Sequence, residues 1–363
     1  MKFCTRATSC EMQSNLRATR KFKFATKMKF ASCSQTHKLT NSQLTNLQIW
    51  DTLLENFHLV VFFPSGVWQK PAMMRDERCF QLVVSIALIM FTLPVVHSMT
   101  KKKLFIGCNW KCALETTDEV DKLCDDLNQM WGSLSDIEKR KVELCVNPPY
   151  VYLDRVRQRL TKEIILGSQN VFDARGPNIG NTGTTTTTML KSVGCKSILL
   201  GHSDRRNNLF ETDELIADKV KKSLSAGLDV TLTIGELPYQ RRWGLALYTL
   251  RKQLKAAAKG IQNNEWDRIV IAYEPVWAVG AGATPCSPEE AQRIGSYIRR
   301  WITKSVSSEA ASACRLTYTG SVDEQNAMKY ASLEDVEGFV VGRAGLDTVK
   351  LRSIIHTLAN SSE

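Results

Sequence analysis

From residue 103 to the end of the chain, short apolar runs alternate with longer amphipathic stretches. The runs are four to six residues long and rich in Val, Ile and Leu, which is typical of buried strands. We therefore predict β-strands at 103–108, 142–146, 164–168, 197–200, 229–234, 269–273, 315–318 and 338–341.

The stretches between these runs predict helices, because their apolar residues recur at spacings of three and four. Four stripes carry this pattern: Val120, Leu123, Cys124, Leu127 and Trp131; Ile216, Val220 and Leu224; Leu247, Leu250, Leu254 and Ile261; and Ala291, Ile294, Ile298, Trp301 and Ile302. Before the fourth stripe, Ser287, Pro288 and Glu290 form a predicted capping box with proline at the first helical position.

A strand followed by a helix, repeated eight times in about 260 residues, indicates the α/β class and a parallel sheet. Eight such units close naturally into a (β/α)8 barrel. The alternative is an open doubly wound sheet, which would favour a GxGxxG turn after the first strand. The first strand runs instead into GCNWK, so we predict a barrel domain over 99–363.

The first 98 residues do not follow this alternation. Residues 1–50 are rich in Ser, Thr, Lys and Arg, with Glu11 as their only acid, which resembles an organelle transit peptide. Residues 79–98 carry no charge and are about long enough to cross a bilayer. The extension is therefore a membrane anchor, a signal peptide starting at Met73, or an alternative start upstream of Met99. We favour the third interpretation, because Pro94 interrupts the apolar run and strand-like sequence follows Met99 closely.

The charge distribution and the cysteine content limit the classes of function that the barrel region can have. Residues 1–98 hold 12 Lys and Arg against 5 Asp and Glu, whereas 99–363 hold 36 against 32. The barrel region has no basic stripe of the kind that nucleic-acid-binding proteins carry, but its mild excess of positive charge favours small anionic substrates. The eleven cysteines are scattered singly, without a CxxC or Cys/His cluster. We predict reduced thiols, no metal site and no cofactor.

In a (β/α)8 barrel the chemistry lies at the carboxyl ends of the strands. An amine, an imidazole and a carboxylate occur there, together with glycine-rich turns after the last three strands. The residues at these ends are Asn109 and Lys111, Gln169 and Asn170, 202–206 with His202 first among them, Glu274, 319–321, and 342–345. This set predicts general acid–base chemistry on a substrate whose anionic group is held by backbone N–H groups.

Three of these segments, NWK, GHSDRR and AYEPVWAVGAG, resemble the signature segments of the triosephosphate isomerase family. The resemblance covers about 101–360 and keeps the order and spacing of the motifs. It implies a TIM barrel that interconverts dihydroxyacetone phosphate and glyceraldehyde 3-phosphate in glycolysis and gluconeogenesis. It also implies a cytoplasmic homodimer without a cofactor. A plastid or another organelle is the alternative if 1–50 is a transit peptide, and a membrane is expected only if 79–98 is an anchor.

The resemblance also implies a role for individual residues. Glu274 is the base that moves a proton between adjacent carbons through an enediol(ate), and His202 is a neutral electrophile. Lys111 neutralises the phosphate and the developing oxyanion, and Asn109 donates to a substrate oxygen. Ser203 contacts the base in the open state. Outside these motifs, the same acid, imidazole and amine would be interpreted as a salt-bridged strand end, a core histidine and a solvated lysine.

The resemblance places the substrate phosphate against Gly280, Ser321, Gly342 and Arg343, with a lid hinged by a proline and by 280–282. Such a lid excludes water, since an exposed enediol phosphate would eliminate its phosphate.

Several positions depart from the family pattern. Asp204 stands where Glu is usual, and Thr184 replaces a Glu of the third loop, which weakens the expected contact between subunits. The lid has Ala281 and Ala283 in place of Thr and Lys. In the phosphate turns, Thr319, Arg343 and Gly345 replace Gly, Gly and Ser.

Arg343 is the most consequential of these departures. We expect its side chain to fold outward or its Cβ to distort the turn, so that Arg343→Gly would raise kcat/KM. A bidentate phosphate clamp is the less favoured alternative.

Three functions remain open at this stage. The first is a working triosephosphate isomerase, and the second is a divergent barrel that binds a partner without efficient catalysis. The third is a barrel isomerase for another phosphorylated metabolite. The presence of Asn109, Lys111, His202 and Glu274 together favours the first.

Overall fold

The computed structural model describes residues 102–172, 182–280 and 283–361. The N-terminal extension, with its basic segment and its uncharged run 79–98, lies outside these residues. Within them, no helix is both long enough and apolar enough to cross a membrane.

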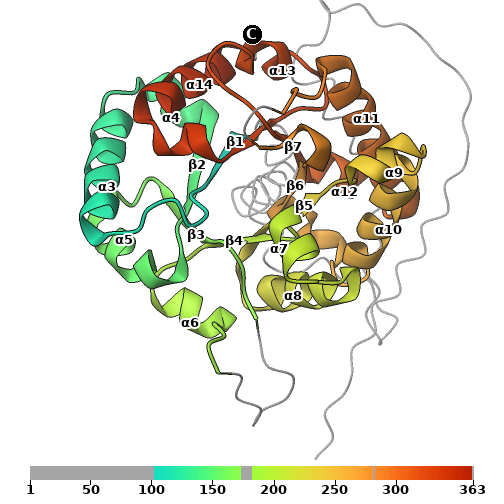
Figure 1. The fold of residues 1–363 in the computed structure, drawn as a ribbon, viewed down its shortest axis with the longest axis horizontal. Helices are drawn as coiled ribbons and strands as arrows, with labels where there is room; N and C mark the ends of the chain where they lie inside the picture. The colour runs from blue at the N-terminus through green and yellow to red at the C-terminus, as the bar shows by residue number, and fades with distance from the viewer. Residues whose placement is uncertain (1–101, 173–181, 281–282, 362–363) are drawn as a thin grey trace, which may run out of the picture. The chain divides into compact units, whose positions relative to one another are not determined.

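Eight parallel strands form a closed barrel in which each strand pairs with its neighbours in sequence and β8 returns to β1 (Figure 1). The strands are β1 (Leu104–Asn109), β2 (Val142–Asn147), β3 (Ile165–Ser168), β4 (Ser197–Leu200), β5 (Asp229–Ile234), β6 (Ile269–Tyr273), β7 (Arg315–Thr319) and β8 (Gly338–Val341). Each boundary lies within one residue of its predicted position, so the predicted (β/α)8 barrel is confirmed.

Helices surround the barrel (Figure 1). The α-helices are α3 (Thr117–Gly132), α4 (Asp136–Lys141), α5 (Leu153–Arg159), α6 (Thr187–Ser192), α7 (Ser203–Asn208), α8 (Asp213–Ser225), α9 (Pro238–Arg242), α10 (Ala246–Ala258), α11 (Pro288–Ser305), α12 (Ser308–Ala313), α13 (Ala327–Ala331) and α14 (Thr348–Asn360). Short 3₁₀ turns are η2 (Tyr150–Tyr152), η3 (Asn263–Arg268), η4 (Val276–Ala278) and η5 (Arg343–Leu346).

The predicted apolar stripes form the layer between the helices and the barrel. The stripe of α3 is buried along its whole length, from Val120 to Trp131, and so is that of α8. Two residues, Leu247 and Trp301, are only partly buried, and Ile261 lies beyond the end of α10. The helical period therefore identifies the buried face correctly but overestimates the length of α10.

The start of α11 shows half of the predicted capping box. The Ser287 hydroxyl accepts a hydrogen bond from the Glu290 N–H at 3.2 Å, which fixes the first turn. The Glu290 carboxylate does not return to Ser287, because it pairs with Arg293 and Arg241 instead. The helix begins where the sequence predicts, with a single cap.

Inside the barrel, the environment changes from apolar to polar along the strands. One buried apolar cluster consists of Phe105, Cys145, Val270, Ala272 and Val340. Toward the carboxyl ends of the strands the buried side chains are polar, namely Asn109, Asn147, Thr233, Glu274 and Thr319. Burying polar groups costs free energy unless they are hydrogen-bonded or bind a ligand, so this end of the barrel is the candidate functional site.

Candidate active site

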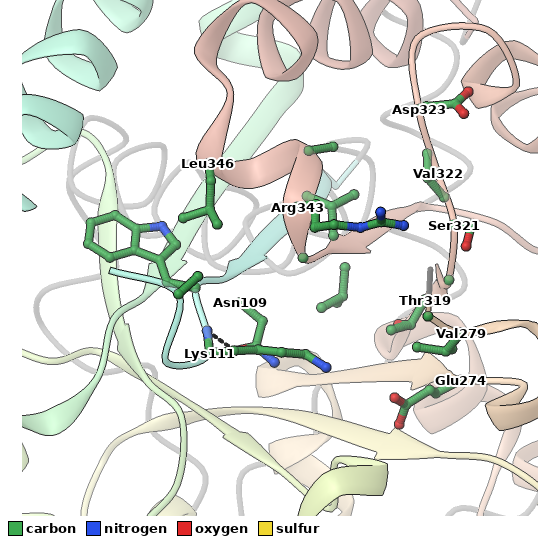
Figure 2. A pocket seen from close by; sticks show the side chains of 18 of the residues that line it. Asn109, Lys111, Glu274, Val279, Thr319, Ser321, Val322, Asp323, Arg343 and Leu346 are labelled. Carbon is green, nitrogen blue, oxygen red and sulfur yellow. Dashed lines mark hydrogen bonds between the residues drawn. The ribbon is translucent and has the colours of Figure 1, made fainter. Parts of the chain in front are cut away.

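The carboxyl ends of the strands open into a pocket of about 630 Å³ (Figure 2). It brings together eight of the predicted site residues: Asn109, Lys111, His202, Glu274, Gly280, Ser321, Gly342 and Arg343. Ser203 and Asp204 do not line the pocket, but each contacts a residue that does.

Glu274 follows β6 directly, and only 1% of its surface is exposed. Both carboxylate oxygens accept hydrogen bonds from Ser203, from its N–H at 2.9 Å and from its hydroxyl at 2.7 Å. The proline that follows lacks a backbone donor and ends the strand. Two hydrogen bonds from one residue thus hold the carboxylate in a buried position.

His202 caps α7 and is buried beside Glu274. Its Nδ1 accepts a hydrogen bond from the Asp204 N–H at 3.1 Å, so this nitrogen carries no proton. The other ring nitrogen, Nε2, lies 3.3 Å from a Glu274 oxygen, so the imidazole and the carboxylate face each other in the pocket.

Lys111 has left-handed backbone geometry, with φ at 51°. This conformation costs a non-glycine residue roughly 1–2 kcal/mol, and surrounding bonds must maintain it. The Asn109 side chain accepts from the Lys111 N–H at 3.0 Å, and the Gln169 amide donates to the Lys111 carbonyl at 2.7 Å. Gln169 also donates to the Asn147 carbonyl at 2.9 Å, which ties the Lys111 loop to β2.

The Lys111 ammonium lies 3.0 Å from the Asp204 carboxylate. Partial burial by itself would raise the pKa of Asp204, but His202 and Lys111 outweigh it and lower that pKa. The 3.0 Å distance also shows that Asp204, although one methylene shorter than the Glu usual at this position, still reaches Lys111. Because about half of the carboxyl side chain is exposed, the pair contributes little to stability and serves mainly to position the amine.

Side-chain contacts of Trp277 fix the start of the segment that follows Glu274. The Trp277 indole donates to Glu236 at 2.7 Å, and the Arg241 guanidinium stacks on the indole at 3.9 Å. Burial raises the pKa of Glu236, and the Trp277 hydrogen bond partly offsets that rise. Gly280 has a φ of 116°, which only glycine adopts readily. Ala281 and Gly282, the next residues of the predicted lid, lie outside the described residues.

Arg343 opens η5, directly after Gly342 at the end of β8. Among the described non-glycine residues, only Lys111 and Phe210 have a positive φ, so Arg343 causes no left-handed strain. Its exposed side chain extends across the pocket toward Ser321 and Val322 (Figure 2). Left-handed strain at Arg343 therefore does not distort the turn, and the side chain lies over the pocket (Figure 2).

Gly345, in the same turn, has a steric explanation. A Cβ at this position would lie 2.8 Å from the Cβ of Cys108, which is closer than real contacts allow. The Cys108 side chain therefore requires glycine here.

The sequence did not identify several groups that shape the site. Gln169 was visible as a polar residue at a strand end, but nothing local connects it to the Lys111 carbonyl. Nothing local in the sequence connects Glu236 or Arg241 to Trp277 either. Within the part of the chain that the structure describes, no cluster of His, Cys, Asp or Glu has the geometry of a metal site, and the cysteines are free.

Comparison with known proteins adds to this geometry. A family model described as triosephosphate isomerase matches residues 104–358. The chain is 40% identical over 266 residues to the chloroplastic triosephosphate isomerase of Arabidopsis thaliana, covering 73% of this chain and 81% of that protein. It is 39% identical over 245 residues to the cytosolic enzyme of Oryza sativa subsp. japonica, covering 68% and 93%. It is 36% identical over 266 residues to the triosephosphate isomerase of Entamoeba histolytica, covering 72% and 99%.

Proposed function

The chain belongs to the triosephosphate isomerase family and is an aldose–ketose isomerase of triose phosphates; we propose that Glu274 is its catalytic base. The substrate phosphate would lie against the turns after β7 and β8, where the N–H groups of Ser321, Gly342 and Arg343 are available to it. Its carbonyl and hydroxyl groups would then face the side of the pocket where Lys111 lies (Figure 2), within reach of His202, which also lines the pocket.

The reaction begins when Glu274 exchanges its hydrogen bonds to Ser203 for the substrate and removes a proton from the carbon beside the carbonyl. The electron pair of that C–H bond forms the carbon–carbon double bond of an enediolate, and the carbonyl oxygen becomes negative. The His202 Nε2–H donates to this oxygen, and Lys111 and the Asn109 amide lie on the same side. His202 then relays the hydroxyl proton of the first carbon to this oxygen, so that the negative charge moves to the oxygen of the first carbon. As Glu274 returns its proton to the adjacent carbon, the electron pair on that oxygen forms the new carbonyl, which completes the isomerisation.

The contact between Glu274 and His202 is the observation that supports this role most strongly. A carboxylate that is 1% exposed and lies 3.3 Å from the His202 imidazole is costly to bury for structure alone. A barrel that only binds triose phosphate has no use for a base and an electrophile directed at the same space.

A coupled assay separates the isomerase from the binding protein and also tests the extension. We expect the full chain and a 99–363 chain to isomerise dihydroxyacetone phosphate with equal specific activity, because every group proposed for the mechanism lies in the barrel region, from Asn109 onward. A full chain that binds a triose phosphate analogue in calorimetry without turning over substrate would establish the binding protein. A folded but inactive 99–363 chain would show that the extension contributes to catalysis.

We propose that the protein acts in the cytoplasm. Chloroplastic and cytosolic relatives are about equally similar to this chain, so the extension decides the location. A fluorescent reporter fused behind residues 1–98 should stay cytoplasmic, and its import into a plastid or another organelle would overturn this proposal.

We propose further that the chain forms a homodimer. Exposed apolar side chains follow β2, β3 and β4 at the carboxyl end of the barrel, namely Tyr150, Met189, Leu209 and Phe210. Phe210 is 81% exposed and has a φ of 54°, a strained conformation that a second copy covering the ring would offset.

Replacing Phe210 by Glu should shift the protein from dimer to monomer in sedimentation velocity, because a carboxylate would be buried at the interface. Val349→Glu is the matched control, since Val349 is equally exposed but lies on α14 across the barrel (Figure 1). A monomeric parent, or a dimer unaffected by Phe210→Glu, would contradict the proposed interface.

A further inference from the structure

The Arg343 side chain extends from the turn after β8 toward the turn after β7 (Figure 2). Both turns lie at one end of the pocket, and Asn109 and Lys111 lie at the other (Figure 2). The residue begins η5 after β8, and its side chain extends toward Ser321 and Val322 after β7 (Figure 2). All three residues line the pocket. A group centred on this space would therefore meet the guanidinium as well as the backbone of both turns.

No carboxylate among the described residues pairs with Arg343, although two acids line the same end of the pocket. Asp347 is committed to capping α14, since it accepts from the Val349 and Lys350 N–H groups at 3.1 and 3.2 Å. Asp323 accepts hydrogen bonds from the N–H groups of Gln325 and Asn326, both at 3.0 Å. Neither acid neutralises the arginine.

Other polar groups at this end are also available to a ligand. The Thr319 hydroxyl is buried, lines the pocket and has no hydrogen-bond partner within the described part of the chain. Lys350 lines the pocket too and forms no ion pair with a described carboxylate. A buried unpaired hydroxyl beside two unneutralised cations suits an oxyanion, because such a ligand accepts from all three.

We propose that Arg343 is a side-chain ligand of the substrate phosphate, adding a charged donor to the backbone N–H groups of the turns. This inference rests on the proposed function, since that function places the phosphate here. Arginine matches phosphate because its planar fork donates two parallel hydrogen bonds. The phosphate does not change charge when the proton moves, so the contact stabilises the bound substrate and the transition state equally. Arg343 therefore sets substrate affinity and leaves turnover unchanged.

Arg343→Met tests this assignment, because methionine removes the charge while retaining an unbranched side chain. We expect KM for the triose phosphate and the inhibition constant of inorganic phosphate to rise about tenfold, with kcat within about twofold of the parent. Isomerisation of glyceraldehyde, which has no phosphate, should be unaffected. Arg343→Lys should fall between the parent and Arg343→Met, since it keeps the charge but loses the fork.

Arg352→Met is the matched control. Arg352 lies on α14, is exposed and does not line the pocket, so its loss removes the same charge without removing the contact. The proposal is overturned if Arg343→Met leaves the phosphate inhibition constant unchanged. It is equally overturned if Arg352→Met weakens phosphate binding as much, since a general field effect would then explain the result.

Phosphate binding measured by calorimetry keeps this test separate from the proposed function. A full chain that does not isomerise triose phosphate but loses phosphate affinity on Arg343→Met would retain the ligand role and refute the catalytic one. An active chain whose phosphate affinity is unchanged in Arg343→Met would retain the catalytic role and refute the ligand role.

Discussion

Replacing Glu274 by Gln should lower kcat by about 10²–10⁴-fold, the contribution typical of a positioned base. The amide is nearly the same size and still accepts a hydrogen bond from the Ser203 N–H, but it cannot take a proton from carbon. The steady-state assay in both directions measures the loss. Affinity for inorganic phosphate should be unchanged, because none of the proposed phosphate contacts involves the Glu274 side chain.

The control for this variant is Glu324→Gln, an exposed acid in the turn after β7 that does not line the pocket. It should retain parental turnover. The urea midpoint of Glu274→Gln should stay close to that of the parent, which excludes unfolding as the cause of lost activity. Turnover near the parental value in folded Glu274→Gln would remove this residue from the mechanism.

Lys111→Met should lower kcat/KM by about 10²–10³-fold, as expected when one charged donor is lost from a preorganised site. Methionine has a similar length and tolerates the left-handed backbone no worse than lysine does. We also expect weaker inhibition by inorganic phosphate, since one cation of the pocket is lost. The pKa of Asp204 should rise, because Lys111 is one of the groups that lower it.

Lys122→Met provides the comparison for Lys111, since Lys122 forms an exposed i,i+4 pair with Asp126 on α3, far from the strand ends. That variant should be kinetically silent. If Lys111→Met leaves both KM and phosphate inhibition at parental values, Lys111 does not contact the substrate.

The fold was predictable because its signal is repeated and local. Each strand is a mostly buried run in which apolar residues predominate, and the longer helices repeat one apolar stripe toward the barrel. Glu274 and His202 were predictable for a related reason, since strand ends converge at one rim of a barrel. The exceptions are where tertiary contacts decide, as at Glu290, whose carboxylate prefers two arginines to the capping role.

The positioning of the site was much less predictable. Gln169 supports the strained Lys111 from 58 residues away in the chain, and Glu236 holds Trp277 from 41 residues away. Such pairs depend on side-chain torsions and on the register of distant strands, which no local pattern encodes. The direction of the Arg343 side chain over the pocket (Figure 2) is a tertiary feature too, which no local pattern in the sequence gives.

Isomerisation in deuterium oxide tests most directly whether Glu274 carries a proton between the carbons. Dihydroxyacetone phosphate is converted with a coupling enzyme that traps the aldehyde, and deuterium at carbon 2 of the product is measured by mass spectrometry. A carboxylate base exchanges its proton with solvent in a fraction of turnovers, so we expect part of the product to carry deuterium. Product formed at the parental rate with no solvent deuterium would indicate direct hydride transfer and would contradict the role proposed for Glu274.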